Sequence, residues 1–507
     1  MSDFMNSSRK GAVVFSYINT ILTIVINIFW SPYLIHTLGD AEYGIYQMAS
    51  SFAGYLVLMN FGTGTVITRY VSLYRARKEE EKQENFIAMA WIVCGVLSCL
   101  ILTVGLLLLG QLGKIYVTLD SYQLAHAQII YLIVLCNIIC TLLTQAFDGI
   151  ILAYENYMFS QIWTLAKSLL RVILVLTLIN WRPDSAFISI VDLTLSSLYL
   201  LISAGYVFIK LKVKCKLRHW DFPLFRETAV FSLAILLQSF VNQVNSSVDK
   251  TLLGAMVSPE SVSMYTLAIN ISTIFSALST ALLGIYLPRF TQIAATSNNK
   301  IEITKAAVQP SRVQFFVSTT VLLAFLLCGK DFVILWVGKE YLQVWTIAAI
   351  LMVPMYFLYL TGIIVSVLDA LGKRLFRSVV LSLAAVGNIL ISIVLIQKYG
   401  ALGAPIGTAI VTILFSVLLM NWYFQFKLDL HIDYLLKEMC RGLWKGELIA
   451  LIVTLPFAIA IPSSKGGFFI KGAIFVAVLL VVELKCGFNS EELSMIRTAI
   501  SKFRGVK

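Results

Sequence analysis

Long apolar runs recur along this chain from one end to the other, separated by short polar breaks. A helix needs about 20 apolar residues to cross the hydrocarbon core of a bilayer, and most of these runs are that long. Because lipid offers no hydrogen-bond partners to the backbone, such a chain must fold into membrane-spanning helices. The predicted spans are residues 11–36, 41–68, 86–110, 124–153, 157–179, 186–209, 227–254, 261–288, 312–329, 343–371, 375–397, 402–426, 443–462 and 467–485.

The composition favours the same class, an all-α polytopic membrane protein with about 14 transmembrane helices. Of the 507 residues, 59% are hydrophobic and only 13% are charged, whereas soluble domains carry about 25% charged residues. The net charge of +12 could suit nucleic acid, but the basic residues gather in alternate loops, most densely at 210–218. That pattern follows the positive-inside rule. It predicts cytoplasmic N- and C-termini and no nucleic-acid partner.

The two halves of the chain resemble each other at a nearly constant spacing. The matching positions include Arg69 with Arg289 and Ile179 with Ile396. A constant spacing over six spans predicts two pseudo-symmetric six-helix lobes. Since six is even, both lobes have the same orientation in the membrane, with the substrate path expected in a central cavity between them.

The predicted domains follow from this repeat: an N-lobe at 1–213, a C-lobe at 214–428, and a segment at 429–507 that holds two extra helices and a cytoplasmic amphipathic tail. The tail begins with Asn489-Ser-Glu-Glu492, which is typical of a capping box at the start of a helix.

Two cations, Lys167 and Arg171, lie inside the predicted span 157–179. Four residues apart, they share one face of a helix. A charge at the bilayer centre costs about 2.5–3.5 kcal/mol on insertion scales, so it usually faces a protein-lined or watery interior. Either the two cations pair with a carboxylate, or they form a cationic floor for an anionic substrate. Their repeat counterparts are Ala384 and Asn388, so fold symmetry does not require them, which favours the substrate role.

Other polar side chains within the spans are further candidates. Asp148 and Asp192 lie on the spans before and after the two cations, and each is either a static counter-ion or the carrier of a coupling proton. Arg69 and Arg289 are additional substrate-binding candidates, although snorkelling to lipid headgroups is an alternative for Arg69. Interhelical hydrogen bonding or the lining of a polar cavity would explain four asparagines: Asn19, Asn27, Asn242 and Asn245.

The chain lacks the motifs of an enzyme or a metalloprotein. Its eight cysteines are scattered, without a C-x-x-C pair, and there is no nucleophile elbow or phosphate-binding glycine loop. We therefore expect no enzyme activity, no metal site and no cofactor, apart from a coupling ion that could be H⁺ or Na⁺. A membrane-embedded polymerase or glycosyltransferase is the alternative from a different class.

Three segments, 8–16, Leu38-Gly-Asp-Ala-Glu-Tyr-Gly-Ile-Tyr46 and Asn60-Phe-Gly-Thr-Gly64, resemble polysaccharide-biosynthesis (Wzx-type) flippases. These belong to the multidrug/oligosaccharidyl-lipid/polysaccharide exporter superfamily. The resemblance covers the whole chain with loose motifs. It implies a monomer in the bacterial inner membrane that turns an undecaprenyl-diphosphate-linked oligosaccharide, such as an O-antigen unit, to the outer face by alternating access. It also implies membrane lipids, and polymerase and chain-length proteins of the same pathway, as partners.

Two relatives in that superfamily are the closest alternatives. Lipid II flippases carry arginines in their first span, whereas positions 17–35 here hold none. Cation-coupled drug exporters that move hydrophobic cations would favour an acidic cavity, whereas the middle of this chain is basic. The glycines at 62 and 64 would permit close packing or local unwinding of the second span.

The charge pattern predicts that residues 210–226 are cytoplasmic. A β-galactosidase reporter fused at residue 218 should be active and an alkaline phosphatase reporter inactive, because the basic loop resists translocation. Fusions within 330–342, a predicted outer loop, serve as the matched control and should show the reverse. Phosphatase activity at residue 218 would overturn the proposed orientation.

Overall fold

The computed structural model describes residues 19, 22–23, 25–26, 28–280, 293, 300–370, 374–489 and 492–494. These residues form helices and their connections, and none of them is in a strand, so the predicted all-α class is confirmed. Ten of the described helices are long and apolar enough to cross a membrane. The chain is therefore a multi-pass membrane protein.

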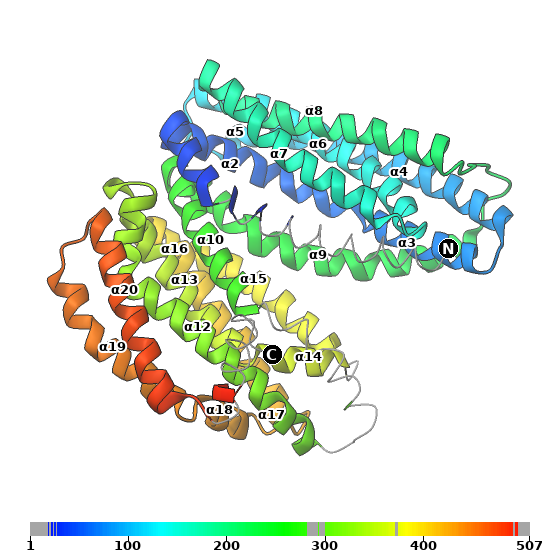
Figure 1. The fold of residues 1–507 in the computed structure, drawn as a ribbon. Coiled ribbons are helices and arrows are strands. Elements are labelled where there is room, and N and C mark those ends of the chain that lie inside the picture. The colour runs from blue at the N-terminus through cyan, green and yellow to red at the C-terminus, as the bar shows by residue number, and fades with distance from the viewer. Residues whose placement is uncertain are drawn as a thin grey trace, which may run out of the picture. The chain divides into compact units, whose positions relative to one another are not determined.

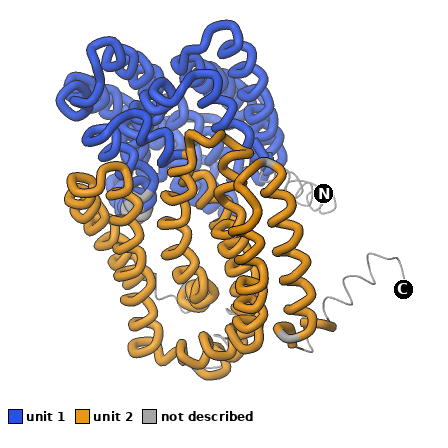
Figure 2. The backbone as a smooth tube through the Cα atoms, turned by 90° about the vertical axis from the view of Figure 1, so that its left-hand side faces the viewer, with its two compact units in different colours: residues 1–266 blue, residues 267–507 orange. Residues whose placement is uncertain are grey.

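The chain divides into two compact units, residues 1–266 and 267–507, shown in blue and orange in Figure 2. This division follows the packing of the helices. The predicted division by the sequence repeat, with lobes that meet at residue 213, is a different one and stays a prediction.

Unit 1 contains a helical stretch at 28–38 and the helices labelled α2 to α9 in Figure 1. Its elements are α2 (Asp40–Gly54), η1 (Tyr55–Asn60), α3 (Thr63–Ala76), α4 (Glu80–Leu109), α5 (Leu112–Ile115), α6 (Ser121–Ala153), α7 (Tyr157–Trp181), α8 (Ala186–Gly205), η2 (Tyr206–Lys210), α9 (Phe222–Met256) and the start of α10 (Pro259–Thr280).

Helix α6 is the centre of unit 1, packed against α2, α3, α4 and α8. It begins with a capping box, in which the Asp120 carboxylate accepts a hydrogen bond from Gln123 N at 2.7 Å. Gln123 Oε1 accepts one in return from Asp120 N at 3.2 Å. These bonds satisfy backbone donors that the first turn of a helix leaves free. The apolar length of α6 then buries Tyr131 and Leu135 completely.

The second predicted span, 41–68, is not one continuous helix. A 3-10 segment, η1, follows α2, and the chain then leaves the helix at Phe61 and Gly62, with left-handed φ values of 50° and 65°. Glycine adopts such a φ without steric cost, which explains Gly62 but not Phe61. The structure thus shows the local unwinding that the glycines permit.

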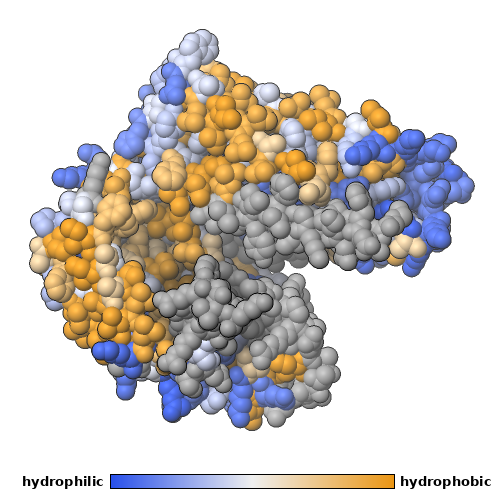
Figure 3. Space-filling model, in the orientation of Figure 1, coloured by the Kyte–Doolittle hydropathy of each residue, from blue (hydrophilic) through white to orange (hydrophobic). Residues whose placement is uncertain are grey.

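The outer surface of unit 1 is apolar along its helices and polar at their ends. Large hydrophobic side chains on α4, α7 and α8 are exposed, among them Leu107, Ile173 and Leu201. Figure 3 shows this hydrophobic band, and hydrophilic residues gather at the end where α3 and α4 meet. Lipid tails rather than water would cover such a band.

At that polar end, the basic loop is attached to the start of α4. Arg218 Nη1 lies 2.6 Å from Glu81 Oε1, and this hydrogen-bonded ion pair raises the pKa of Arg218 above its ordinary value. Asn85 Oδ1 accepts a hydrogen bond from Arg218 N at 2.7 Å. The end of the loop is therefore held in place next to the α3–α4 turn.

Unit 2 contains the rest of α10 and the helices that follow it. Its elements are α12 (Lys300–Trp336), η3 (Lys339–Tyr341), α13 (Gln343–Leu360), α14 (Gly362–Ala370), α15 (Arg374–Tyr399), η4 (Gly400–Leu402), α16 (Gly403–Val411), η5 (Thr412–Leu419), α17 (Met420–Phe426), α18 (Ile432–Cys440), α19 (Leu443–Ala460), α20 (Lys465–Val482) and η6 (Glu483–Gly487).

A buried ion pair links the long helix α12 to α20. Lys471 Nζ lies 2.8 Å from Asp331 Oδ2, and the two side chains are only 3% and 1% exposed. Asp331 Oδ1 also accepts a hydrogen bond from Ser464 N at 2.9 Å. The carboxylate thus has partners on both of its oxygens, as a charge buried in an apolar surrounding requires.

We expect Asp331→Ala to lower the free energy of unfolding by about 3–5 kcal/mol, because it leaves the Lys471 charge buried without a partner. Thermal and denaturant unfolding of the purified protein would measure the loss. Arg441→Ala is the control, since its side chain is 77% exposed and pairs with Glu438 at 3.4 Å. An exposed pair contributes about 0–1 kcal/mol. Equal losses in the two variants would contradict the structural role of the buried pair.

Candidate functional site

A polar cavity of about 940 Å³ lies within unit 1. Its walls come from η1, α3, α6 and α9. The left-handed residues Phe61 and Gly62 line it, so the helix break that interrupts the second span faces the cavity. Unwound backbone at membrane depth is tolerated where it lines such a space. The main polar side chains in the wall are Asn60, Arg69, Gln145, Asp148, Asn242 and Gln243.

Close packing of two small residues sets α3 against α6 on one side of this cavity. A β-carbon on Gly149 would come within 2.7 Å of the Gly64 carbonyl oxygen. Thr68 Oγ1 donates a hydrogen bond across the same contact to Gly149 O at 3.1 Å. Small residues and interhelical hydrogen bonds are typical of membrane helix pairs. The contact fixes how α3 presents Arg69 and how α6 presents Asp148.

Arg69 is the cation of the cavity wall. Its guanidinium carbon lies 4.5 Å from the centre of the Phe231 ring and 5.6 Å from that of Tyr70. Within the described part of unit 1 it makes no ion pair, and its charge is stabilised by these ring faces. A cation in this position keeps N–H groups that could donate hydrogen bonds to an anionic ligand.

The predicted cations of α7 lie against α8. Arg171 Nε donates to Asp192 Oδ1 at 2.6 Å and Nη2 donates to Oδ2 at 3.0 Å, which is a bidentate ion pair. The two side chains are 28% and 21% exposed. The guanidinium also lies 5.5 Å from the centre of the Trp30 ring. Asp192 is therefore the counter-ion of Arg171 in this structure, one of the two roles that the sequence left open.

Lys167 and Asp148 have neutral partners on α8. Lys167 Nζ donates to Ser196 Oγ at 3.0 Å, and the Tyr199 hydroxyl donates to Asp148 Oδ1 in a short hydrogen bond. The ring of Trp163 stacks on Tyr199, with centres 4.9 Å apart and planes at 10°. Helices α6, α7 and α8 thus hold two cations and two carboxylates in one polar layer, and Asp148 joins this layer to the cavity.

The remaining predicted site residues differ in what the structure shows. Asn19 Nδ2 donates to Gln161 Oε1 at 2.8 Å and to Gln161 O at 3.1 Å, as expected for interhelical hydrogen bonding. Asn242 lines the cavity. Three predicted residues lie outside what the structure describes, Asn245 by its side chain and the others entirely: Asn27, Asn245 and Arg289.

The structure adds residues that the sequence did not single out as site candidates. Gln145 lies three residues before Asp148 and so shares its helix face. Asn60 is 5% exposed and its Oδ1 has no hydrogen-bond partner among the described residues. Tyr199 and Ser196 provide the neutral partners on α8. Polar side chains inside long apolar runs were the available signal for each of them.

A separate polar cluster ties α2 to α6 and to the start of α8. His126 Nε2 lies 2.7 Å from Glu42 Oε1 and 3.5 Å from Asp184 Oδ1. Glu42 Oε1 also accepts hydrogen bonds from Ser185 N at 3.1 Å and Ser185 Oγ at 2.7 Å. Histidine and carboxylates are residue types that bind metals. Their oxygens and nitrogen are here engaged with one another, which suits a clamp that joins helix ends.

Comparison with known proteins gives a family match and a shared fold. Residues 9–294, more than half of the chain, match the model of a family described as polysaccharide biosynthesis protein. A Shigella flexneri protein provisionally named as an O-antigen transporter is 20% identical over 396 residues, which cover 77% of this chain and 92% of that protein.

Solved structures of two transporters resemble the fold of this chain. Lipid II flippase MurJ in an inward closed conformation has a TM-score of 0.73 at 17% identity, covering 93% of this chain and 98% of that one. An inward-facing multidrug resistance MATE family transporter of the MOP superfamily has a TM-score of 0.64 at 12% identity, covering 82% and 99%. These similarities show a common architecture.

We expect Asp192→Ala to lower the thermal stability of the purified protein, because it removes the bidentate partner of Arg171 and leaves this mostly buried charge without a counter-ion. The loss should be about 3 kcal/mol, since both side chains are mostly buried. Arg171→Ala should also destabilise, and the double variant should lose less than the sum of the two, by about 0.5–3 kcal/mol. Thr194→Ala on α8 is the control. Strictly additive losses would show that the two residues are not coupled.

Proposed function

The chain belongs to the polysaccharide biosynthesis protein family, and we propose that it is the flippase for an undecaprenyl-diphosphate-linked oligosaccharide repeat unit. It would move this unit from the cytoplasmic to the outer face of the bacterial inner membrane by alternating access. The family match and the transporter fold support a membrane transporter. The choice of cargo is supported by the cations and amides of the candidate site.

The observation that carries this proposal is the polar cavity of unit 1, with Arg69 in its wall and without an ion pair to that arginine among the described residues. A diphosphate headgroup is costly to bring into an apolar layer unless cations receive it. Arginine can hold phosphate oxygens with two parallel hydrogen bonds. The volume of about 940 Å³ lies at the upper end of the range for ligand pockets, so the diphosphate and the first sugars would fit together.

The amides of the cavity suit the sugar part of this cargo. Asn60, Gln145 and Gln243 present both donors and acceptors in the wall. Sugar hydroxyls use both kinds of partner. Side chains of this type recognise hydroxyl groups, which all sugars carry, and do not require a charged sugar.

The layer formed by α7 and α8 would provide the second set of cations. Lys167 has only a neutral hydrogen-bond partner, Ser196, whereas Arg171 is held by Asp192. We infer that Lys167 meets the diphosphate directly. Arg171 would exchange its carboxylate for a phosphate oxygen. Because Asp192 competes for the guanidinium, the affinity for the cargo stays modest, which release on the outer side requires.

A second candidate, a lipid II flippase, is favoured by one observation, the architecture shared with MurJ. Lipid II also carries a diphosphate, so the same cations would receive it. Genetic replacement separates the two: a chain that rescues loss of the lipid II flippase handles lipid II, whereas one that restores only surface polysaccharide handles an oligosaccharide unit.

We expect Arg69→Ala and Arg171→Ala each to lower export at least tenfold at matched membrane levels, because a hydrogen bond to a charged group contributes about 1.5–3 kcal/mol. Lys167→Ala should be milder, and Arg171→Lys should keep partial activity. The Lys167→Ala/Arg171→Ala double variant should abolish export and leave lipid-linked units on the cytoplasmic face. Surface-polysaccharide complementation measures each effect.

Lys82→Ala is the control for this series, since its side chain is 65% exposed and lies outside the cavity. It should export at the wild-type rate. If the double variant also exports at that rate, Lys167 and Arg171 are structural and their role as a cationic floor is refuted. If Arg69→Ala does so as well, the proposed cargo site is refuted.

A further inference from the structure

Two of the buried carboxyl groups of unit 2 lie in helices that follow the predicted repeat. Glu447 on α19 is 3% exposed and Glu483, the first residue of η6, is 0% exposed. The sequence did not single out either residue. Helix α19 packs on both α20 and η6, and α12 packs on α19 and α20, so the two carboxyls lie where these helices meet.

Neither carboxyl has the partners that an ionised form would need. No described residue donates a hydrogen bond to Glu483 Oε1 or Oε2, and Glu447 Oε2 is likewise without a donor. Glu447 Oε1 accepts one hydrogen bond, from Thr320 Oγ1 at 3.0 Å. A carboxylate without partners in an apolar interior is strongly disfavoured relative to the neutral acid.

Close packing keeps Glu483 in this position. Its carboxyl oxygens lie so near Gly446 and Gly487 that neither glycine has room for a β-carbon. Gly446 precedes Glu447 in the chain, and the two carboxyls are within electrostatic reach of each other. If both carboxyls were ionised, their negative charges would repel, which favours the protonated form of at least one of them.

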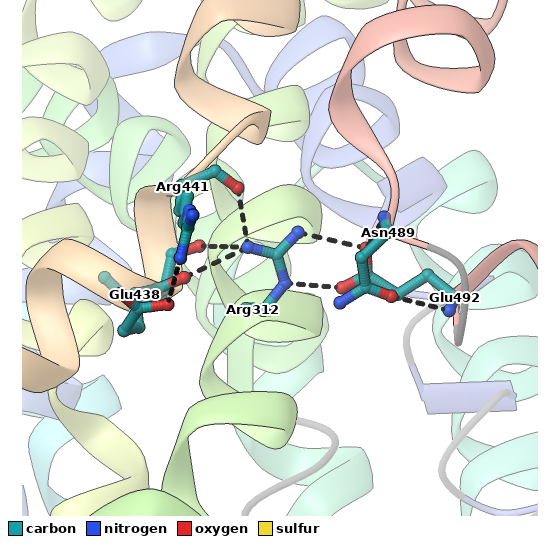
Figure 4. Close-up of polar contacts among 6 residues, drawn as sticks. Arg312, Glu438, Arg441, Asn489 and Glu492 are labelled. Atoms are coloured by element: carbon teal, nitrogen blue, oxygen red, sulfur yellow. Dashed lines mark hydrogen bonds and ion pairs between the residues drawn. The ribbon is translucent and has the colours of Figure 1, made fainter.

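Arg312, a cation whose charge acts on Glu483, is held by other partners, as Figure 4 shows. Its Nε and Nη2 donate to Glu492 at 2.7 and 3.0 Å. Its Nη1 donates to the carbonyl oxygens of Glu438 at 3.0 Å and Arg441 at 2.6 Å. Glu492 in turn forms the predicted capping box with Asn489, with 2.8 Å hydrogen bonds in both directions.

Among the described residues, the other charged and titratable groups around this site form no ion pair with Glu447 or Glu483. Glu492 is a further negative charge close to Glu483, and Lys471 on α20 is paired with Asp331. Tyr356 on α13 lies close to Glu447 and to Cys440 on α18. A tyrosine hydroxyl and a cysteine thiol are ordinarily neutral at neutral pH, so neither Tyr356 nor Cys440 is a counter-ion.

A small pocket lies beside this region. It has a volume of about 310 Å³ and is lined by Gly487 and Arg312 together with Arg441, whose side chain is 77% exposed. The Glu483 carboxyl packs against Gly487. The pocket thus borders the glycine that the Glu483 carboxyl contacts, and we expect protons to exchange with solvent on this side.

We propose that Glu447 and Glu483 form a proton-binding site in unit 2 and that both are carboxylic acids at neutral pH. Each carboxylate takes up one proton and becomes neutral, which removes the desolvation cost of the charge. The site is independent of the cargo, since it is built from α12, α19 and η6 alone and requires no bound lipid.

Infrared difference spectroscopy on the full-length protein in lipid membranes tests this directly, because a protonated carboxyl has a C=O stretching band that a carboxylate lacks. At neutral pH the wild-type protein should show such a band. Glu483→Gln and Glu447→Gln should each remove part of it, and the double variant should remove both parts. Glutamine has the shape of the neutral acid, so these variants should keep the wild-type thermal stability.

Glu438→Gln is the matched control, since Glu438 is a partly exposed carboxylate beside the same pocket and pairs with Arg441. It should leave the band unchanged. An unchanged band in the double variant, or no band in the wild-type protein at neutral pH, would overturn the proposal. A band that sodium ions abolish at constant pH would also overturn it, because the carboxylates would then bind a metal cation rather than protons.

Discussion

An apolar solvent supplies no partner for a charge, and the arrangement of this protein follows from that constraint. In both units, described cations that are buried or mostly buried pair with carboxylates from another part of the chain: Arg171 with Asp192, Lys471 with Asp331, and Arg312 with Glu492. Because an unpaired charge in such a place is far more costly than a pair, these contacts fix the rotation of one helix against another. The apolar contacts alone would tolerate several rotations.

The groups that depart from this rule are the informative ones. Arg69 has aromatic faces in place of a carboxylate, and Lys167 has a serine hydroxyl. Glu483 has no hydrogen-bond donor among the described residues. Fold stability does not explain why such groups are there, since a buried charge without a charged partner costs free energy. They are therefore better explained by a ligand that binds reversibly. For Arg69 and Lys167 this ligand would be an anionic headgroup, and for Glu483 it would be a proton.

The polar cavity depends on backbone features as much as on side chains. The left-handed residues Phe61 and Gly62 interrupt the second predicted span. The close contact of Gly64 with Gly149 brings α3 and α6 together just after the break in the chain. A continuous helix with larger residues would fill this space. The break and the small residues thus produce a cavity whose wall carries Arg69 and Asp148.

The class of protein and most helix positions can be read from the residues alone, because the length of an apolar run is a local property. The predicted spans 124–153 and 157–179 correspond to α6 (Ser121–Ala153) and α7 (Tyr157–Trp181). The sequence also identified Lys167 and Arg171 as charges inside a span. The packing of the helices was needed to show that Asp192 pairs with Arg171 while Asp148 accepts a hydrogen bond from Tyr199. It was also needed to show that Glu447 and Glu483 lie within electrostatic reach of each other. The partner of a side chain depends on how neighbouring helices are rotated and packed, and hydropathy carries no information about that.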